Sequence, residues 1–460
     1  MQKNEKKIYW LLFGIILILQ LLTITYFIVE KKSYHVDETY SYILSNSYDT
    51  DCISNAEEYW NTWLQGDEFM DFVTVQEGER FSYDKVAYNN SLDAHPPLYY
   101  FILHSICSLF PNTFSRWLGM SLNIVCFILT QLLLYCLSKK IFGNTLWALA
   151  PLAIYGGTML GIDTATFARM YMLLAMFTVL LAYIHYQMWE RGVKKSDYIL
   201  CFIITFLGTY TQYYFAFIAF CLAAATCMYL LLKKRWKELI IYGFSMLLAI
   251  VCVFIVWPAG ITQITGSDTN NVGNEVASNI LNFKGWPKAI FYMCCHIVFG
   301  ALEGILYYKW IIGTAAIVIL VLAIKFRKEE PKEDHTSIVF LLVSIGILFG
   351  TVAIISHVTG KFIYSRYIYN IVPLFALAGT IFVKVICDKT KLNQRICAAG
   401  LIFVWLISMF ALVRGDLNTY LFEEQAASEQ AIIELCEDKP LVMIGNENET
   451  HLPTGNIMIL

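Results

Sequence analysis

The stretch that decides the fold is YILCFIITFLGTYTQYYFAFIAFCLAAATCMYLLL, from Tyr198 to Leu232. It contains no Asp, Glu, Lys or Arg, and its one polar break is Thr211–Tyr214. A bilayer core takes roughly 20 apolar residues as a helix, so the stretch is long enough for two short spans joined at this break. A basic cluster, 233–235, follows directly. We therefore predict an integral membrane protein in which this stretch crosses the bilayer twice.

The composition of the whole chain points the same way. Of its 460 residues, 58% are hydrophobic and 15% are charged, whereas soluble domains have roughly 25% charged residues. The formal net charge of -3 lacks the basic excess that would neutralise phosphates, so we expect no nucleic-acid partner. The 13 cysteines are scattered without a Cys-x-x-Cys pair. We therefore expect neither a zinc site nor a disulfide framework.

The same length criterion predicts an all-α polytopic protein with eleven spans. They lie near 8–29, 117–137, 145–161, 171–189, 198–212, 214–232, 240–258, 306–325, 337–356, 367–387 and 396–413. The first is too long for a signal-peptide core and lacks a small-residue cleavage site, so we expect it to be retained as an anchor. Two shorter apolar stretches, 98–110 and 289–302, are predicted to lie along the outer membrane surface as amphipathic helices.

Basic residues predict the orientation in the membrane, because short cytoplasmic loops are rich in Lys and Arg. Six clusters hold 19 of the 33 Lys and Arg residues, at 3–7, 139–140, 191–195, 233–237, 325–332 and 389–395. If all six are cytoplasmic, an even number of spans separates each from the next, and this is why 198–232 is divided into two helices. The N-terminus is then cytoplasmic. The predicted outer segments are 30–116, 162–170, 211–214, 259–305, 357–366 and everything after Arg414.

Two parts of the chain follow from this topology. We predict a transmembrane domain over 1–413, which includes the outer loop 30–116, and a short soluble tail over 414–460 outside the membrane. From Glu30 to Pro96 the loop has 14 acidic and four basic residues, and loops of this length usually carry function. In the tail, 421–437 has helical spacing and 440–445 is typical of a strand, so we expect a small α/β unit.

Asp37 and Glu38 follow the first span closely, in Tyr34-His35-Val36-Asp37-Glu38. A carboxylate held at the membrane face can act as a general base toward a hydroxyl group presented from outside. The alternative is one more acidic pair in a solvated loop, and the dipeptide alone favours that interpretation.

His95-Pro96-Pro97-Leu98-Tyr99-Tyr100 is a more specific element. The prolines predict an extended entry followed by the start of a helix, and the tyrosines suit the headgroup layer. A helix that begins at the membrane surface explains the prolines and tyrosines, but it leaves His95 and the nearby Asp93 unexplained.

Arg169 and Arg366 are isolated cations at the outer ends of spans, in Ala168-Arg169-Met170-Tyr171 and Ser365-Arg366-Tyr367. The excess of basic residues on the cytoplasmic side disfavours them there, so each needs a local partner. The planar guanidinium suits phosphate and carboxylate. An ion pair with an acid of the outer loop is an equally good interpretation.

Taken in chain order, these motifs resemble the C-type glycosyltransferase superfamily, specifically the bacterial relatives of protein O-mannosyltransferases and of lipid A aminoarabinose transferases. The resemblance covers roughly 8–413 and implies an inverting transferase that takes a sugar from a polyprenyl-phosphate donor outside the cytoplasm. It implies Asp37 as the general base that deprotonates the acceptor hydroxyl, with Arg366 and Arg169 stabilising the phosphate leaving group. The other residues predicted to bind substrates are Glu38, Asp93, His95, Tyr99, Tyr171 and Tyr367. Relatives often have His-Tyr where this chain has Gln212-Tyr213, so no role is carried over to that pair.

The resemblance predicts a set of partners and leaves alternatives open. The partners are a polyprenyl-phosphate-linked sugar donor, membrane lipid, and an extracytoplasmic acceptor that is a glycan, a lipid or a protein of the cell envelope. No cofactor is expected, although a divalent metal on Asp37, Glu38, Asp93 and His95 is a less favoured hypothesis. The alternative function is a transporter or flippase of a lipid-linked precursor, which would favour mid-span charges and repeat symmetry. A third interpretation is an assembly factor that keeps the scaffold without activity.

Overall fold

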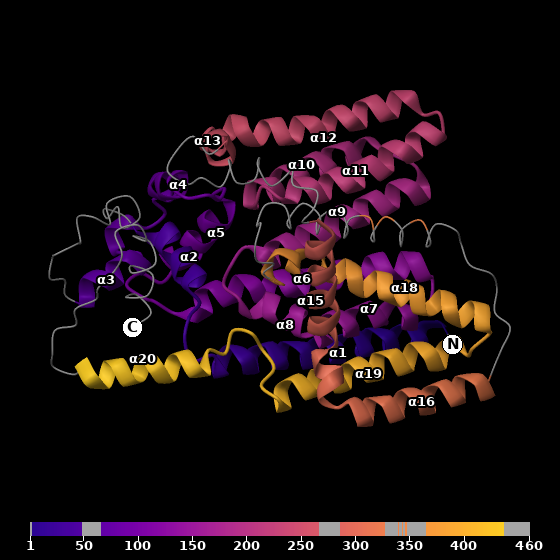
Figure 1. Ribbon diagram of the computed structural model, residues 1–460. Coiled ribbons are helices and arrows are strands. Elements are labelled where there is room, and N and C mark those ends of the chain that lie inside the picture. Colours follow the sequence, from indigo (N-terminus) through magenta and orange to yellow (C-terminus); the bar gives the residue numbers. More distant parts are fainter. Residues whose placement is uncertain are drawn as a thin grey trace.

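The protein is a bundle in which most of the long helices lie along roughly one axis, whereas α15 crosses them (Figure 1). The computed structural model describes residues 2–47, 66–265, 286–326 and 365–436, together with Val339, Val343 and Gly346. These residues form helices, turns and irregular segments, and no strand occurs among them. The all-α, multi-pass membrane fold predicted from the sequence is therefore confirmed.

Seven helical segments of the described residues are long and apolar enough to cross a membrane. They are α1 (Gln2–Glu30), α6 (Arg116–Phe142), α9 (Tyr171–Arg191), α11 (Phe215–Leu232), α12 (Trp236–Val256), η3 (Ser365–Ile371) with α18 (Val372–Thr390), and α19 (Gln394–Arg414). Two bent pairs raise the number to nine, namely α7 (Thr145–Gly157) with α8 (Met159–Thr166), and α15 (Trp286–Tyr307) with α16 (Lys309–Lys325). Most of the predicted span 337–356 lies outside the described residues, so the total of eleven stays a prediction.

The division of 198–232 into two helices is confirmed. Helix α10 (Lys195–Thr211) has 17 residues and ends at the polar break, and α11 begins at Phe215. The turn between them is tight, because a Cβ atom on Gly208 would lie 2.3 Å from the ring of Phe215. Helix α11 can therefore run back beside α10, toward the end of the bundle at which α10 begins.

Contacts between the basic loops show which of them share an end of the bundle. Lys140 pairs with Glu190 at 3.0 Å, and a Cβ atom on Gly192 would lie 3.2 Å from the guanidinium of Arg235. The clusters 139–140, 191–195 and 233–237 are thus neighbours. Asn393 likewise donates to the carbonyl of Phe326 at 2.8 Å, which joins the last two clusters. This agrees with the even number of spans that the sequence predicts between them.

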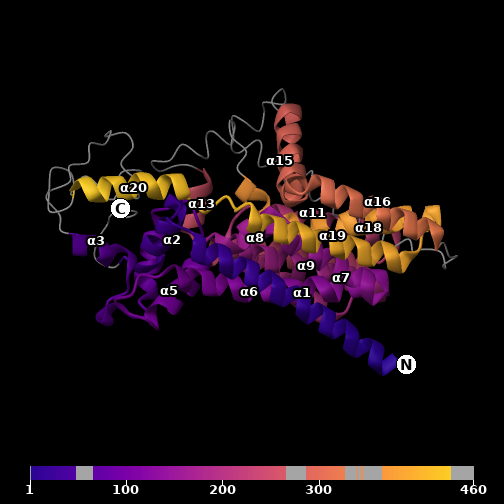
Figure 2. The ribbon, with the colours of Figure 1, turned by 90° about the horizontal axis from the view of Figure 1, so that it is seen from below.

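The described residues between α1 and α6, 31–47 and 66–115, contain a series of short helices. They are α2 (Val36–Asn46), α3 (Gly66–Val73), η2 (Glu77–Glu79), α4 (Tyr83–Ser91) and α5 (Leu98–Ser108). Figures 1 and 2 show them at the end of the bundle opposite the N-terminus, with α13 (Ala259–Thr265) and α20 (Glu423–Cys436) at the same end. The predicted helices at 98–110 and 421–437 are confirmed as α5 and α20. The predicted strand at 440–445 lies outside the described residues.

One predicted span is wrong in its shape. The sequence predicts a continuous helix over 145–161 and an outer loop over 162–170, but α7 and α8 meet at Thr158 with a bend of 64°. Thr158 ends α7 and caps α8, because its hydroxyl accepts the N–H of Gly161 at 3.1 Å. A Cβ atom on Gly157 would lie 2.6 Å from the carbonyl oxygen of Trp405. The close contact between α19 and the flexible pair Gly156–Gly157 therefore explains why the helix is bent here.

The predicted surface helix at 289–302 is also longer than expected. It forms α15, and its last part meets α16 at 93°. Figure 2 shows α15 standing out from the bundle at the start of α16.

Candidate active site

Asp37 lies in the first turn of α2. The helix begins where Nδ1 of His35 accepts the N–H of Asp37 at 3.0 Å and the Glu38 carboxylate accepts the N–H of His35 at 2.9 Å. These reciprocal bonds are a capping box, and acids in a first turn are favoured by the helix dipole. The sequence at 35–38 therefore holds the backbone of Asp37 in place. His35 was missed from the sequence, although a glutamate three residues after a potential cap is the signal that could have found it.

Glu38, the neighbour of Asp37, is fully buried and bonded on both oxygens. Nζ of Lys31 lies 2.6 and 2.5 Å from these oxygens, and the N–H of Ala168 donates to Oε1 at 2.8 Å. Lys31 also donates to the carbonyl of Thr166 at 3.3 Å. These bonds join the end of α1, the start of α2 and the turn before α9. Glu38 is thus an anchor of the site, and the substrate contact predicted for it would have to replace one of these bonds.

Asp37 and Arg366 form an ion pair across 329 positions of the chain, between Oδ2 and Nη1. Their side chains are 22% and 18% exposed, so the pair is accessible rather than enclosed. The guanidinium of Arg366 also lies over the ring of Tyr367, at 5.6 Å from its centroid. The acid and the cation that the sequence assigned to one membrane face are therefore in contact.

Arg169 is a second cation behind Asp37. Its Nη1 donates to the backbone carbonyl of Asp37 at 3.2 Å, to the hydroxyl of Ser41 at 3.3 Å and to that of Tyr100 at 3.2 Å. The side chain is buried, and its Nε has no hydrogen-bond partner among the described residues. A guanidinium held by neutral acceptors keeps its charge available to a neighbouring anion.

The two arginines determine the charge state of Asp37. Burial raises the pKa of this carboxyl because it disfavours the charged form, but the positive charges of Arg169 and Arg366 outweigh burial. The net result is a pKa below the ordinary value of an aspartate. Asp37 is therefore ionised at neutral pH.

Asp93 and His95 form a second pair beside the first. The carboxylate of Asp93 accepts from Nδ1 of His95 at 2.6 Å, which orients the imidazole ring. Burial raises the pKa of Asp93, but the charges of His95 and Arg169 bring it below its ordinary value. His95 also contributes to lowering the pKa of Asp37. The two pairs therefore share one electrostatic environment.

Gln263, on α13, holds the Asp93 segment in place and was missed from the sequence. Its Nε2 donates to the carbonyls of Asn90 and Asp93 at 2.8 and 2.6 Å, and its Oε1 accepts from the hydroxyl of Tyr213 at 2.5 Å. Tyr213 therefore supports the site through Gln263. A single amide that joins distant segments leaves no periodic signal in a sequence, so motif reasoning could not find it.

The predicted tyrosines differ in their contacts. Tyr367 lies under Arg366, as described above, and Tyr171 stacks on Phe167 with ring centroids 5.9 Å apart. Tyr99 is fully buried, and its hydroxyl has no hydrogen-bond partner among the described residues. Its neighbour Tyr100, which was not predicted, makes the contact with Arg169 instead.

The four residues considered for a divalent metal do not gather into one ligand set. Glu38 is bonded to Lys31, Asp37 to Arg366 and Asp93 to His95. Within the described ranges, no three His, Cys, Asp or Glu side chains are arranged to hold a metal ion. Metal dependence stays a hypothesis that would require these pairs to rearrange.

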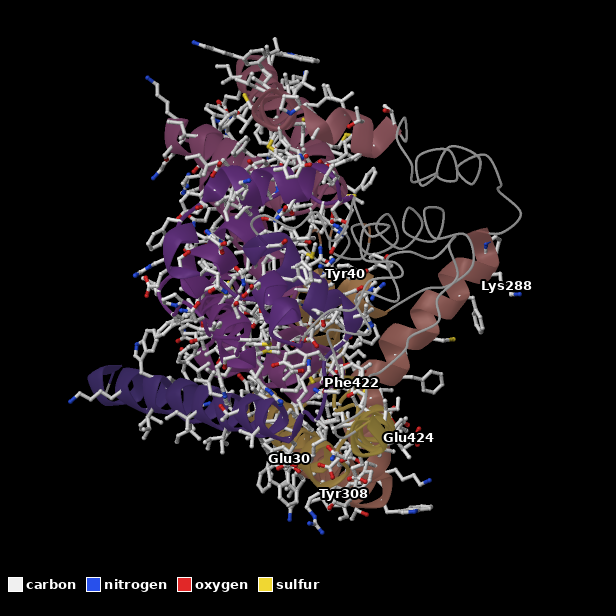
Figure 3. All side chains as sticks on the ribbon, turned by 90° about the vertical axis from the view of Figure 1, so that its left-hand side faces the viewer. Glu30, Tyr40, Lys288, Tyr308, Phe422 and Glu424 are labelled. Atoms are coloured by element: carbon white, nitrogen blue, oxygen red, sulfur yellow. The ribbon has the colours of Figure 1, made fainter. Side chains whose placement is uncertain are left out.

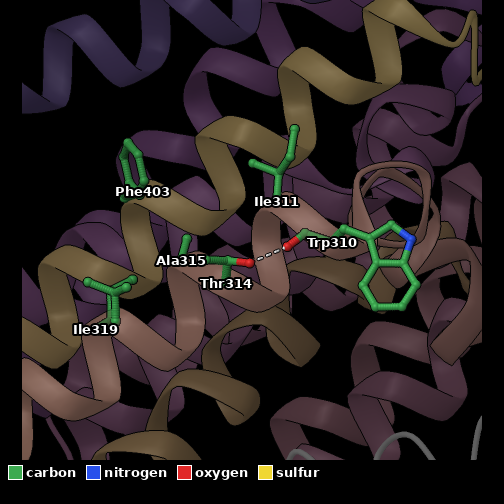
Figure 4. A pocket seen from close by; sticks show the side chains of 7 residues that line it. Trp310, Ile311, Thr314, Ala315, Ile319 and Phe403 are labelled. Atoms are coloured by element: carbon green, nitrogen blue, oxygen red, sulfur yellow. Dashed lines mark hydrogen bonds between the residues drawn. The ribbon is translucent and has the colours of Figure 1, made fainter.

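An apolar groove of about 590 Å³ lies elsewhere, between α16 and α19 (Figure 4). Trp310, Ile311, Ile319 and Phe403 are among its lining residues. It shares no residue with the cluster around Asp37. In a membrane protein, an apolar groove of this kind suits lipid chains.

Comparison with known proteins identifies the scaffold. Residues 94–257 match the family model described as dolichyl-phosphate-mannose-protein mannosyltransferase. The crystal structure of ArnT from Cupriavidus metallidurans bound to undecaprenyl phosphate is similar in fold, with a TM-score of 0.50 and 11% identity over 96% of this chain and 88% of that chain. The family match over 94–257 and the fold shared with ArnT both resemble the C-type glycosyltransferase superfamily.

Two further solved structures are less similar to this chain. The apo structure of the same ArnT gives a TM-score of 0.49 with 10% identity, over 95% of this chain and 87% of that one. Arabinosyltransferase EmbB from Mycobacterium smegmatis gives 0.34 with 13% identity, over 87% of this chain and 41% of that one. The sequence matches none of the curated proteins.

Proposed function

We propose that the protein is a membrane glycosyltransferase that moves a sugar from a polyprenyl-phosphate donor to an acceptor hydroxyl outside the cytoplasm. The observation that supports this proposal most directly is the contact between Asp37 and Arg366, with Arg169 behind them. An acid and two cations at one end of a membrane bundle are the groups that such a reaction needs. The solved ArnT structure with bound undecaprenyl phosphate supports a lipid-phosphate donor for this fold.

In the proposed reaction, Asp37 is the general base. The acceptor oxygen attacks the anomeric carbon from the face opposite the phosphate, its proton passes to the Asp37 carboxylate, and the bond from the anomeric carbon to the phosphate oxygen breaks. The configuration at the anomeric carbon is therefore inverted. The departing polyprenyl phosphate gains one negative charge, which Arg366 and Arg169 stabilise.

Donor binding should also make Asp37 a stronger base, because Asp37 is paired with Arg366 before the donor binds. With Arg366 on Asp37, the carboxylate is a weak base because its charge is already stabilised. A donor phosphate competes for the same guanidinium, since arginine binds phosphate and carboxylate in the same way. When Arg366 moves to the phosphate, Asp37 becomes a stronger base at the moment when the donor is in place.

The test is a comparison of surface glycans in cells that lack the protein and in cells that produce it. We expect mass spectrometry to show one glycan, glycolipid or glycoprotein without its sugar in the deletion strain. The wild-type chain restores the sugar, and Asp37→Asn lowers its transfer by at least about 100-fold, within the range that general-base catalysis supplies.

Asp84→Asn is the matched control, because Asp84 is an exposed acid in the first turn of α4. It should transfer sugar like the wild type. A folded, membrane-inserted Asp37→Asn protein with the wild-type rate would show that Asp37 is not the base.

The transporter alternative has one observation in its favour, the buried Asp163 in the broken pair α7–α8. Its carboxylate, however, accepts bonds from the N–H and hydroxyl of Thr419 and from the hydroxyl of Tyr369.

An assay of the purified protein with a lipid-linked sugar and an acceptor extract distinguishes the two functions. Transfer without a membrane gradient supports the enzyme, and movement of the lipid without transfer supports the flippase.

A further inference from the structure

The segment that follows α19 returns to the site and packs over it. We name residues 416–422 the strap. Its backbone adopts the left-handed conformation at both ends, with φ of 48° at Asp416 and 56° at Phe422. Such angles are uncommon for residues other than glycine, so tertiary contacts must hold the strap in this path.

Four hydrogen bonds hold the first part of the strap. The hydroxyl of Tyr26 donates to Asp416 at 2.6 Å. The N–H of Thr419 donates to Asp163 at 3.0 Å, and its hydroxyl donates to the other oxygen of that carboxylate. The amide of Asn418 donates to the hydroxyl of Thr166 at 2.9 Å. The first half of the strap is therefore bonded to α1 and to α8.

The second half contacts the end of α1. The N–H of Lys32 donates to the carbonyl of Leu421 at 2.9 Å. The ammonium of Lys31 lies 5.5 Å from the ring centroid of Tyr420 and 5.6 Å from that of Phe422. In Figure 3, Phe422 and Glu424 lie near Glu30, the last residue of α1.

Tyr420 contacts both turns that carry the reactive groups. Its ring stacks on Phe167 with centroids 4.2 Å apart and planes 2° apart, and it meets His35 edge-on at 6.2 Å. Phe167 is joined to Arg169 by a tight turn, because the N–H of Arg169 donates to the Phe167 carbonyl at 2.7 Å. His35 caps the helix turn of Asp37. One buried ring therefore lies against the supports of both Arg169 and Asp37.

We infer that Tyr420 is a positioning residue, through which the strap holds Arg169 and Asp37 at the separation that sugar transfer needs. This inference rests on the proposed function. The strap touches the supports and not the reactive atoms, so its loss should slow the chemical step more than it weakens donor binding. Misplacement of catalytic groups by about 1 Å can cost on the order of 100-fold in rate.

The test uses the full chain in detergent micelles and the variant Tyr420→Leu, which removes the stacked ring. We expect kcat to fall by roughly 10- to 100-fold, while the KM for the lipid-linked donor changes by less than about 3-fold. Tyr420→Phe keeps the ring and should retain most of the wild-type kcat.

A second measurement does not depend on activity. Hydrogen–deuterium exchange of the peptide that contains 166–171 reports on the Arg169 turn, where the N–H of Ala168 is bonded to Glu38. We expect exchange in this peptide to be at least about 10-fold faster in Tyr420→Leu than in the wild type.

Tyr308→Leu is the matched control, because Tyr308 stacks on Phe410 with centroids 6.5 Å apart and planes 15° apart, away from the site. It should leave both kcat and the exchange of 166–171 unchanged. If Tyr420→Leu is not recovered folded, Phe422→Leu removes the neighbouring ring of the strap and is measured in its place.

The outcomes separate the inference from the proposed function. Exchange of 166–171 that stays at the wild-type rate, or that rises equally in Tyr308→Leu, overturns the positioning role. A wild-type protein that transfers no sugar overturns the proposed function, and the exchange measurement still decides whether the strap holds the Arg169 turn. A donor KM that rises as much as kcat falls would show a binding role instead.

Discussion

At the scale of single residues, the site combines groups that are free to react with groups that are not. Asp37 and Glu38 are neighbours in one helical turn. Asp37 is partly exposed and pairs with Arg366, whereas Glu38 is buried and bonded to Lys31. Both side chains are carboxylates, so their chemical type does not explain which of them can accept a proton. Their hydrogen-bond partners explain it, because a carboxylate with all its acceptor positions filled cannot accept a proton from a substrate.

Arg366→Ala should separate donor use from acceptor use. We expect the KM for the lipid-linked donor to rise on the order of 10- to 100-fold, because a hydrogen bond to a charged group contributes about 1.5–3 kcal/mol. The acceptor KM should change much less. Steady-state kinetics with each substrate varied in turn measures both values, and an unchanged donor KM would remove Arg366 from the donor site.

The same variant should change the pH dependence. The pKa of Asp37 is lowered in the folded protein, so the base is present at neutral pH and is lost only as pH falls through that lowered value. Removing one of the two cations leaves burial less opposed and raises the pKa of Asp37. The acid limb of kcat/KM in Arg366→Ala should therefore move to higher pH, and a limb that moves to lower pH would contradict the assigned electrostatics.

At the scale of helices, the site depends on how the elements end. Helix α1 ends just before Lys31, α2 begins at a capping box, and α9 begins after the turn that carries Arg169. The buried pair of Lys31 and Glu38 joins these three ends. A buried ion pair need not stabilise a protein more than apolar residues would, but breaking one partner away is costly.

Lys31→Met should therefore destabilise the protein by about 3–5 kcal/mol, because it leaves Glu38 buried without its cation. The matched control is Lys32→Met, since Lys32 pairs with Glu30 while both are exposed, at 47% and 40%. Pairs of that kind contribute about 0–1 kcal/mol. Thermal unfolding in detergent compares the two variants.

The double variant Lys31→Met/Glu38→Gln completes the comparison. A neutral amide can still accept the N–H of Ala168, so most of the lost stability should return. Equal stability of Lys31→Met and Lys32→Met would show that the buried pair is not the joint between these helices.

At the scale of the whole molecule, the two ends of the bundle have different chemistry. The short helices α2 to α5, with Asp37 on α2, lie at one end, and the N-terminus lies at the other. The sequence predicts that the basic loops are cytoplasmic, and this orientation would make the site face outward, as the proposed function requires.

Cysteine labelling in intact cells tests this orientation. Asp84→Cys, on α4, should react with a membrane-impermeant maleimide in intact cells, because Asp84 lies at the end that carries the site. Lys233→Cys, in a basic loop, should react only after the cells are opened. The wild-type chain gives the background from its own cysteines, and the reverse pattern would place the site in the cytoplasm.

The sequence predicted those features that local patterns encode. The polar break at Thr211–Tyr214 predicted the division between α10 and α11, and the two prolines after His95 predicted the start of α5. The bend at Thr158 was not predicted, because it arises from contact between Gly157 and a helix that follows much later in the chain. The same limit applies to Gln263 and to the strap, since packing between distant segments leaves no local pattern.

The bonds on Glu38 have a consequence for the choice of donor. Because they hold the first turn of α2, the Asp37 carboxylate can adjust only by rotation of its own side chain. In the proposed reaction, a lipid-linked substrate must then bring its anomeric carbon to the position fixed by this carboxylate. Tail length would matter little, since the tail extends into hydrocarbon, whereas a headgroup one sugar ring longer would place the wrong carbon beside the base.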